Sequence, residues 1–250
     1  MPTPFTHLVI AREMLARPEL APGVRAALSA ELPAFLFGNI APDAQTVSGQ
    51  SREATHFFPV PLGNAPPAHR RLFARHPELA HVRQLPAAQA AFLAGYLAHL
   101  ALDQLWVSDI FDPVFGERQT WSTFPKRIYL HNALRAYLDA DDLRRLPEKV
   151  AVSVSAAQPQ DWLPFLADKP LRGWRDLVAG QLHTGEVRTA EVFAGRMGAD
   201  PRAFAALVES PNEMRRRVFS RLPRERLDRY RADGLALCLQ LIEAYWEGTL

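Results

Sequence analysis

The sequence is poor in cysteine, in lysine and in residues that favour β-strands. Its 250 residues include one cysteine, Cys238, which excludes an intramolecular disulfide framework and any zinc module built from several cysteines. Runs that alternate between apolar and polar residues, as a half-buried strand requires, are missing. The formal net charge of +2 is too small to indicate a nucleic-acid-binding protein.

Signals for export or membrane insertion are also missing. The chain opens with Met1-Pro2-Thr3-Pro4, and neither a basic segment nor an apolar one follows. The longest apolar stretch, residues 87–107, contains polar side chains that a lone membrane span disfavours. These are Gln89, His99, Asp103 and Gln104. We therefore expect a cytoplasmic protein without a transmembrane segment.

Helical periodicity is what the sequence does contain, nearly throughout. The spacing of apolar residues predicts helices over residues 6–17, 23–32, 68–83, 87–111, 124–138, 159–167, 171–184, 186–197, 200–209 and 224–246. Residues 44–67 are rich in Ser, Gly, Asn and Pro, which predicts a loop with one turn of helix near His56. We expect a single all-α domain over residues 1–250, a multi-helix bundle. Residues 1–140 form its core and residues 141–250 a C-terminal helical layer.

Two polar residues interrupt the most apolar of these helices. His99 and Asp103 are four residues apart, so their side chains leave one face of the helix one turn apart. Burying an imidazole and a carboxylate in an apolar bundle is costly unless they are paired or bind a metal. Taken alone, the pair favours a structural hydrogen bond, because the pattern is short and common.

Three further residues have side chains of the same chemistry at places where a helix starts or a loop meets an apolar segment. They are His7, Asp43 and His56. Together with His99 and Asp103 they offer five nitrogen and oxygen ligands, which suit zinc or a similar divalent ion. Each also has a structural explanation, as a helix-start, turn or half-buried loop residue. Spacing this loose leaves both interpretations open.

Four segments that contain these residues occur in the order expected of one family. They are Thr6-His7-Leu8, Phe37-Gly38-Asn39-Ile40-Ala41-Pro42-Asp43, Thr55-His56-Phe57-Phe58 and Gly95-Tyr96-Leu97-Ala98-His99-Leu100-Ala101-Leu102-Asp103. From residue 1 to about 140, the chain resembles the zinc-dependent phospholipase C and P1-type nuclease superfamily. The resemblance is greatest to the bacterial cytoplasmic zinc-dependent phospholipase C branch. It implies an all-α fold that holds zinc ions and hydrolyses phosphate esters.

The resemblance also implies a ligand set. Asp43, His56, His99 and Asp103 correspond to the ligands of one zinc ion. Asp103 also corresponds to a bridge toward a second ion, held by His7 and by the N-terminal amine. Because Asp43 is expected to face solvent, it is our candidate to orient or deprotonate the attacking water.

The sequence departs from the family at the third zinc ion. Asp109, His131 and Arg135 occupy the corresponding positions, and Arg135 stands where the family has a carboxylate. A guanidinium is a fixed cation and repels a metal. We therefore expect one or two zinc ions rather than three, or a His131 that pairs with Asp109. Arg135 is a candidate to bind a phosphate oxygen, and Trp106 to contact the substrate, although core packing explains Trp106 as well.

The function predicted on these grounds is that of a metal-dependent phosphoesterase, a zinc hydrolase of phosphoric esters. Its substrate would be a small phosphate ester or a phospholipid. The alternative is a non-catalytic helical module that keeps a partial zinc site for structure or for a partner. A metal-free protein with hydrogen-bonded core histidines is a third interpretation. No stable nucleic-acid partner is predicted, because acidic residues dilute the arginine-rich stretch 215–231 and few aromatic residues interleave it.

Overall fold

The computed structural model describes residues 1–186 and 188–250, and their regular structure is entirely helical. In chain order the elements are α1 (Pro4–Ala16), α2 (Pro22–Ala30), α3 (Leu32–Gly38), η1 (Ala41–Ala44), α4 (Gln45–Ser48), α5 (Arg52–His56), α6 (Ala68–Arg75), η2 (Pro77–Ala80), η3 (Val82–Gln84), α7 (Ala87–Trp106), η4 (Val107–Phe115), α8 (Phe124–Arg145), α9 (Glu148–Ala156), α10 (Asp168–Thr184), α11 (Thr189–Met197), α12 (Pro201–Glu209), α13 (Pro211–Met214), η5 (Arg215–Phe219) and α14 (Arg224–Glu247). The all-α expectation is confirmed.

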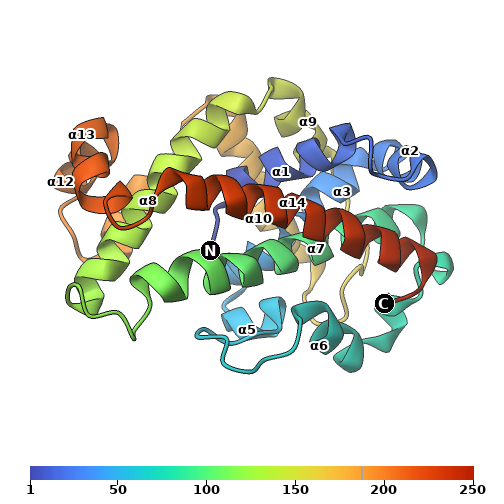
Figure 1. Ribbon diagram of the computed structural model, residues 1–250. Helices are drawn as coiled ribbons and strands as arrows, with labels where there is room; N and C mark the ends of the chain where they lie inside the picture. Colours follow the sequence, from blue (N-terminus) through green and yellow to red (C-terminus); the bar gives the residue numbers. More distant parts are fainter. Residues whose placement is uncertain (187) are drawn as a thin grey trace.

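Helix α7 lies at the centre of the molecule. It packs against α3 on one side and against α14, which crosses it in front in Figure 1. The π-helical turns of η4 extend it, so the continuous helix Ala87–Phe115 is long and apolar enough to cross a membrane by composition. However, 83% of its most apolar window is buried inside the protein. This is the pattern of a core helix in a soluble protein.

Two glycines allow α3 and α7 to pack backbone against backbone. A Cβ atom added at Gly38 would lie 2.0 Å from the carbonyl oxygen of Phe92, and one added at Gly95 would lie 2.3 Å from that of Phe35. No larger residue fits at either position without moving a main chain. The close approach brings the end of α3, with Asn39, beside the polar side of α7.

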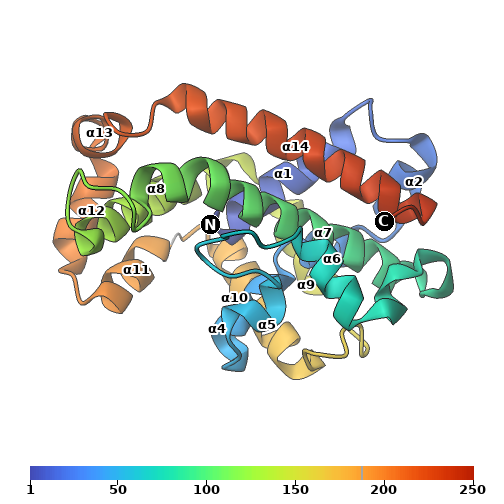
Figure 2. The same ribbon diagram turned by 60° about the horizontal axis from the view of Figure 1, so that its bottom comes forward.

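Helices α1 and α8 complete the surroundings of this polar side. Helix α1 packs against α8, α14 and α7, and α8 in turn contacts α11 and α12. Figure 2 shows the N-terminus between α8 and α7, with α4 and α5 on the far side of α7 from α14. Residues 44–67 were predicted as a loop with one turn of helix near His56; they contain the short helices α4 and α5, and residues 57–67 have no helix.

The structure differs from the predicted elements in two neighbouring places. The helix predicted over residues 159–167 is wrong, because this segment runs without helix across the core and buries Trp162, Leu163 and Leu166. A helix that the sequence analysis missed, α9, starts directly after Pro147, which takes the N-cap position.

The expected division between residues 1–140 and 141–250 stays a prediction. Contacts between the two parts are extensive, since α9 packs on α3, α10 on η1 and α14 on α7.

Candidate metal centre

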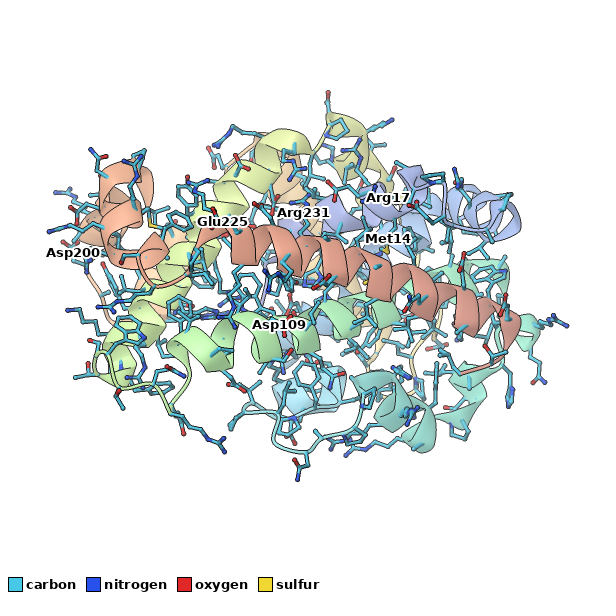
Figure 3. The ribbon with its side chains drawn as sticks, in the orientation of Figure 1. Met14, Arg17, Asp109, Asp200, Glu225 and Arg231 are labelled. Carbon is cyan, nitrogen blue, oxygen red and sulfur yellow. The ribbon has the colours of Figure 1, made fainter. Side chains whose placement is uncertain are left out.

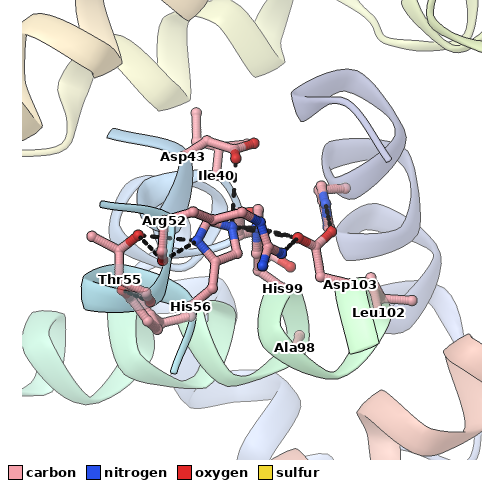
Figure 4. A network of polar contacts seen from close by, with 12 residues as sticks. Ile40, Asp43, Arg52, Thr55, His56, Ala98, His99, Leu102 and Asp103 are labelled. Carbon is pink, nitrogen blue, oxygen red and sulfur yellow. Dashed lines mark hydrogen bonds and ion pairs between the residues drawn. The ribbon is translucent and has the colours of Figure 1, made fainter. Parts of the chain in front are cut away.

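Five side chains from four elements meet beside the polar side of α7. His7 comes from α1, Asp43 from η1, His56 from the last position of α5, and His99 and Asp103 from α7. Figure 4 shows Asp43, His56, His99 and Asp103 converging, and His7 lies 3.4 Å from Asp103; we call these five residues the His–Asp cluster. All are buried except Asp43, which keeps 22% of its side chain exposed.

Asp103 is the member that the others surround. Its Oδ1 lies 3.4 Å from His7 Nε2, and its Oδ2 lies 3.3 Å from His56 Nε2 and 3.7 Å from His99 Nε2. On the other side of His56, Asp43 Oδ1 is 3.6 Å from the same Nε2 atom. Both carboxylates therefore face imidazole nitrogens, and the two oxygens of Asp103 point toward different histidines.

Backbone carbonyls decide which nitrogens of His56 and His99 are free. The Nδ1 atom of His99 lies 2.8 Å from the carbonyl oxygen of Asn39, and that of His56 lies 3.2 Å from the carbonyl oxygen of Arg52. A carbonyl oxygen only accepts, so an Nδ1 atom that bonds to it carries a proton, and the Nε2 atom is left for another partner. The two Nε2 atoms lie 3.3 Å apart beside the carboxylates of Asp43 and Asp103, so a proton or a metal ion fits between these donors.

Burial and neighbouring groups set the charges of His99 and of the two carboxylates. Burial, with His7 beside it, lowers the pKa of His99 to about 3, so its ring is neutral at physiological pH. Burial opposes ionisation of Asp103 and Asp43, but the neighbouring histidines outweigh it. They hold the pKa of Asp103 well below its usual value and that of Asp43 at about 2. Ionised carboxylates and neutral imidazoles are the forms that bind metals.

Several buried atoms of the cluster have no hydrogen bond among the described residues. They are Nδ1 and Nε2 of His7 and Oδ1 of Asp103. The ring of His7 stacks on that of His99, with centroids 3.9 Å apart. Zn–N distances of about 2.0–2.1 Å place tetrahedral ligands about 3.3 Å from one another, and the donor separations of 3.3–3.7 Å are close to this. The residues therefore fit a divalent ion.

The donors divide into two overlapping groups that share His99. One contains His7, His99 and Asp103, and the other Asp43, His56 and His99, with the ligand atoms of each group within 4.8 Å of one another. Since His99 Nδ1 is engaged by a carbonyl, only its Nε2 can bind an ion.

The N-terminal amine lies in the electrostatic surroundings of the same cluster. Burial lowers its pKa well below the usual value, and Arg135 and Arg52 lower it further while Asp103 and Asp43 oppose them. Thr3 donates a hydrogen bond to Asp139 of α8 and holds this end of the chain in place. The amine therefore favours its neutral form, the form in which nitrogen ligates.

The expected pairing of His131 with Asp109 is wrong. His131 Nε2 accepts a hydrogen bond from Trp106 Nε1 at 2.9 Å. Asp109, labelled on η4 in Figure 3, accepts one from Ser108 Oγ at 2.7 Å and is half-buried. Asp109 follows Asp103 by six residues, about 1.7 turns of helix, which rotates its side chain away from the cluster. Neither Asp109 nor His131 belongs to the donor groups found among residues 1–186 and 188–250.

Trp106 and Arg135, the two expected substrate contacts, differ in accessibility. Trp106 is 1% exposed, and a side chain so enclosed supports His131 and has no open face for a substrate. Arg135 is half-buried, with its guanidinium 4.4 Å over the ring of Phe193 and one nitrogen bonded to Asn132 Oδ1. Its Nε atom is buried without a partner among the described residues.

Comparison with protein families agrees with this site. Residues 6–106 match the model of the family described as zinc-dependent phospholipase C. This segment is similar to that family. The matched segment contains all five members of the His–Asp cluster and ends before Asp109, His131 and Arg135. Nothing among curated proteins or solved structures matches the chain.

The structure adds residues around the His–Asp cluster that the sequence analysis missed. Arg52 donates to Asp103 Oδ2 at 2.7 Å. Tyr96 donates from its hydroxyl to the carbonyl oxygen of Thr55 and so holds the end of α5 against α7. The signal for Arg52 was available, since it precedes His56 by four residues and therefore shares its helix face. It escaped notice because residues 44–67 were expected to be mostly loop.

Proposed function

We propose that this protein is a zinc-dependent hydrolase of phosphate esters. The observation that carries the proposal is the convergence of His56 Nε2 and His99 Nε2, 3.3 Å apart, on an ionised Asp103. The family match over residues 6–106 supports zinc as the ion.

The residues that would hold the ions follow from the separations. Asp43, His56, His99 and Oδ2 of Asp103 surround one position, and His7 with Oδ1 of Asp103 faces a second. We propose one or two ions. A divalent ion held there supplies Lewis-acid chemistry, which makes water more acidic and neutralises charge on phosphoryl oxygens.

Asp43 has the clearest catalytic role among the side chains. It is the one member of the His–Asp cluster with appreciable exposure, so solvent reaches the cluster past it. A general base works best with a pKa near the working pH, whereas the pKa of Asp43 is about 2. Asp43 is therefore better suited to orienting the attacking water through a hydrogen bond than to taking its proton.

Arg135 supplies the cation at the position where the family has a third ligand. Asp43, Asp103 and Asp139 all lie within its electrostatic reach, and its buried Nε atom has a proton to donate. We propose that Arg135 binds a phosphate oxygen of the substrate, as a planar guanidinium does well. A cytoplasmic location is part of the same proposal, supported by the single, buried thiol of Cys238.

The test is metal stoichiometry by elemental analysis on protein purified without a His tag. We expect one or two equivalents of zinc in the wild type and a clear loss in His99→Ala. His81→Ala, which removes an exposed histidine outside the cluster, is the matched control and should keep its zinc. Absence of zinc after reconstitution of the wild type would overturn the proposal.

Activity is then measured on a phosphomonoester, a phosphodiester and phosphatidylcholine vesicles, with zinc-loaded wild type and His99→Ala. Hydrolysis of any of them by the wild type alone supports an enzyme and identifies the substrate class. Zinc binding without turnover on all three would favour the non-catalytic helical module instead. That alternative draws its support from Arg135, which replaces a metal ligand.

A further inference from the structure

Arg52 bonds to the side of Asp103 that faces the histidines. It begins α5 one turn before His56, and its NH2 atom donates to Asp103 Oδ2 at 2.7 Å. The same oxygen lies 3.3 Å from His56 Nε2 and 3.7 Å from His99 Nε2. Figure 4 shows the guanidinium among these donors. A permanent cation therefore lies at an oxygen that belongs to the proposed ligand set.

A guanidinium and a divalent ion cannot both be close partners of this oxygen at low cost. Both are positive, and repulsion between charges a few ångströms apart is strong in a site shielded from water. Arginine also keeps its proton at every physiological pH, so Arg52 cannot escape the conflict by becoming neutral. The ion pair with Asp103 must weaken when a metal enters.

The surroundings of Arg52 allow it to bind an anionic group from solvent in place of Asp103. Its side chain is 23% exposed, close to the 22% of Asp43, whereas Asp103 and the histidines of the cluster are enclosed. Its guanidinium lies 4.4 Å over the ring of Phe58, which supports the charged group from one face. Arg52 and Asp43 are thus exposed to solvent at the edge of the cluster, where an anionic group can contact them.

We propose that Arg52 is a two-position anion-binding residue. It neutralises Asp103 while the cluster lacks its metal, and it binds a phosphate oxygen of the ligand once the metal takes its place on Asp103. This inference rests on the proposed function, since it requires a metal at the His–Asp cluster. It assigns Arg52 to recognition of the phosphate group and to control of metal affinity.

The first test measures the zinc affinity of the metal-free protein by competition with a chelating dye, a readout that needs no activity. Because Arg52→Ala removes a competing cation from Asp103, we expect it to bind zinc about tenfold more tightly than the wild type. Arg52→Lys keeps the charge and should stay near the wild type. Arg75→Ala is the matched control, since Arg75 is exposed, lies 5.9 Å over the ring of Phe57 and does not contact Asp103.

The second test measures binding of inorganic phosphate to the zinc-loaded proteins by titration calorimetry. We expect Arg52→Ala to bind phosphate at least about tenfold more weakly than the wild type. Arg52→Lys should lose part of the affinity, because a lysine cannot form two parallel hydrogen bonds to a phosphate. Arg75→Ala should bind phosphate as the wild type does.

The outcomes separate this inference from the function on which it rests. Unchanged or weaker zinc binding by Arg52→Ala, beside normal zinc binding by the wild type, would mean that Arg52 only orients Asp103, and would overturn the inference alone. Unchanged phosphate binding by zinc-loaded Arg52→Ala would overturn it as well. A wild type that binds no zinc would overturn both the inference and the proposed function.

Discussion

Two buried polar groups lie side by side in this protein, and α1 contributes to both. His7 belongs to the His–Asp cluster, while Thr6, its neighbour in sequence, belongs to a second group that we call the Thr–Asp cluster. The Thr–Asp cluster consists of Thr3, Thr6, Asp139, Asp142 and Thr189. Both groups enclose two aspartates, yet they differ in how these are satisfied.

In the Thr–Asp cluster, hydroxyl groups supply the donors. Thr3 and Thr189 each donate to one oxygen of Asp139, and Thr6 donates to Asp142 at 2.6 Å. Arg231, labelled in Figure 3, lies 3.7 Å from the other oxygen of Asp142. Each carboxyl oxygen has a partner from the protein, so the cluster is complete as it stands.

The His–Asp cluster has acceptors in excess of donors. The Nε2 atoms of His56 and His99 lie 3.3 Å apart, and an oxygen of Asp103 and both ring nitrogens of His7 have no hydrogen bond among the described residues. Unsatisfied buried polar groups each cost about 1–3 kcal/mol, and an ion bound to these atoms would remove that cost. The comparison therefore supports a structural role for the Thr–Asp cluster and the proposed ion for the His–Asp cluster.

The largest expected effect comes from the same substitution made in each cluster. Asp103→Asn should remove most of the bound zinc and lower hydrolysis by more than about 100-fold, the upper end for residues that merely support a ligand. Asp139→Asn should keep both zinc and activity, because its partners are hydroxyl groups. Elemental analysis and a phosphoester assay on the two variants provide the measurement. Full zinc occupancy in Asp103→Asn would contradict the cluster as described.

A second effect concerns pH and belongs to the Thr–Asp cluster alone. Burial raises the pKa of Asp139 to about 7 against its two threonine donors. Since the folded pKa lies above the unfolded one, the stability from neutral Asp139 is complete below about pH 4 and is lost as the pH rises through about 7. The pKa difference corresponds to about 4 kcal/mol at most.

Urea unfolding at pH 5 and pH 8, with a chelator present, measures this effect. The wild type should lose more unfolding free energy between the two pH values than Asp139→Asn, which has no carboxyl group to ionise. Equal losses in the two proteins would show that Asp139 titrates normally.

The difference between the clusters also explains what was predictable from sequence. The helical periodicity and the four motifs were enough for the all-α fold and for bringing His7, Asp43, His56, His99 and Asp103 to attention. Motif glycines Gly38 and Gly95 now have a physical reason, since they let α3 approach α7. Local sequence patterns were sufficient to predict a site residue where that residue lies within a recognisable motif.

The features that could not be predicted from the sequence depend on contacts between distant segments. The partner of His131 is Trp106, 25 residues away, and no spacing rule distinguishes it from Asp109. The threonine donors of Asp139 lie 136 and 50 residues from it. Residues 159–167 contain enough apolar side chains for a helix, but these pack into the core from an irregular segment that two prolines keep from being helical.

Zinc itself should stabilise the His–Asp cluster. At a free zinc concentration of 100 times Kd, the unfolding free energy of the wild type should rise by about 2.7 kcal/mol. Because His99→Ala lacks a ligand, it should gain much less, while the His81→Ala control should gain as much as the wild type. Chemical denaturation with zinc and with a chelator measures the gain. An equal gain in His99→Ala would locate the zinc elsewhere.

The smallest expected effect tests whether His131 is a core residue held by a hydrogen bond or a metal ligand. In the structure its Nε2 atom is already occupied by the indole N–H of Trp106, as the carboxyl oxygens of the Thr–Asp cluster are by hydroxyl groups. Trp106→Phe removes that donor and should cost about 1–2 kcal/mol of unfolding free energy, with zinc stoichiometry unchanged. If His131 were a ligand held back by Trp106, freeing its Nε2 would instead raise the zinc content. Unfolding and elemental analysis of this one variant therefore decide whether His131 completes the core, as its hydrogen bond indicates, or a further metal position.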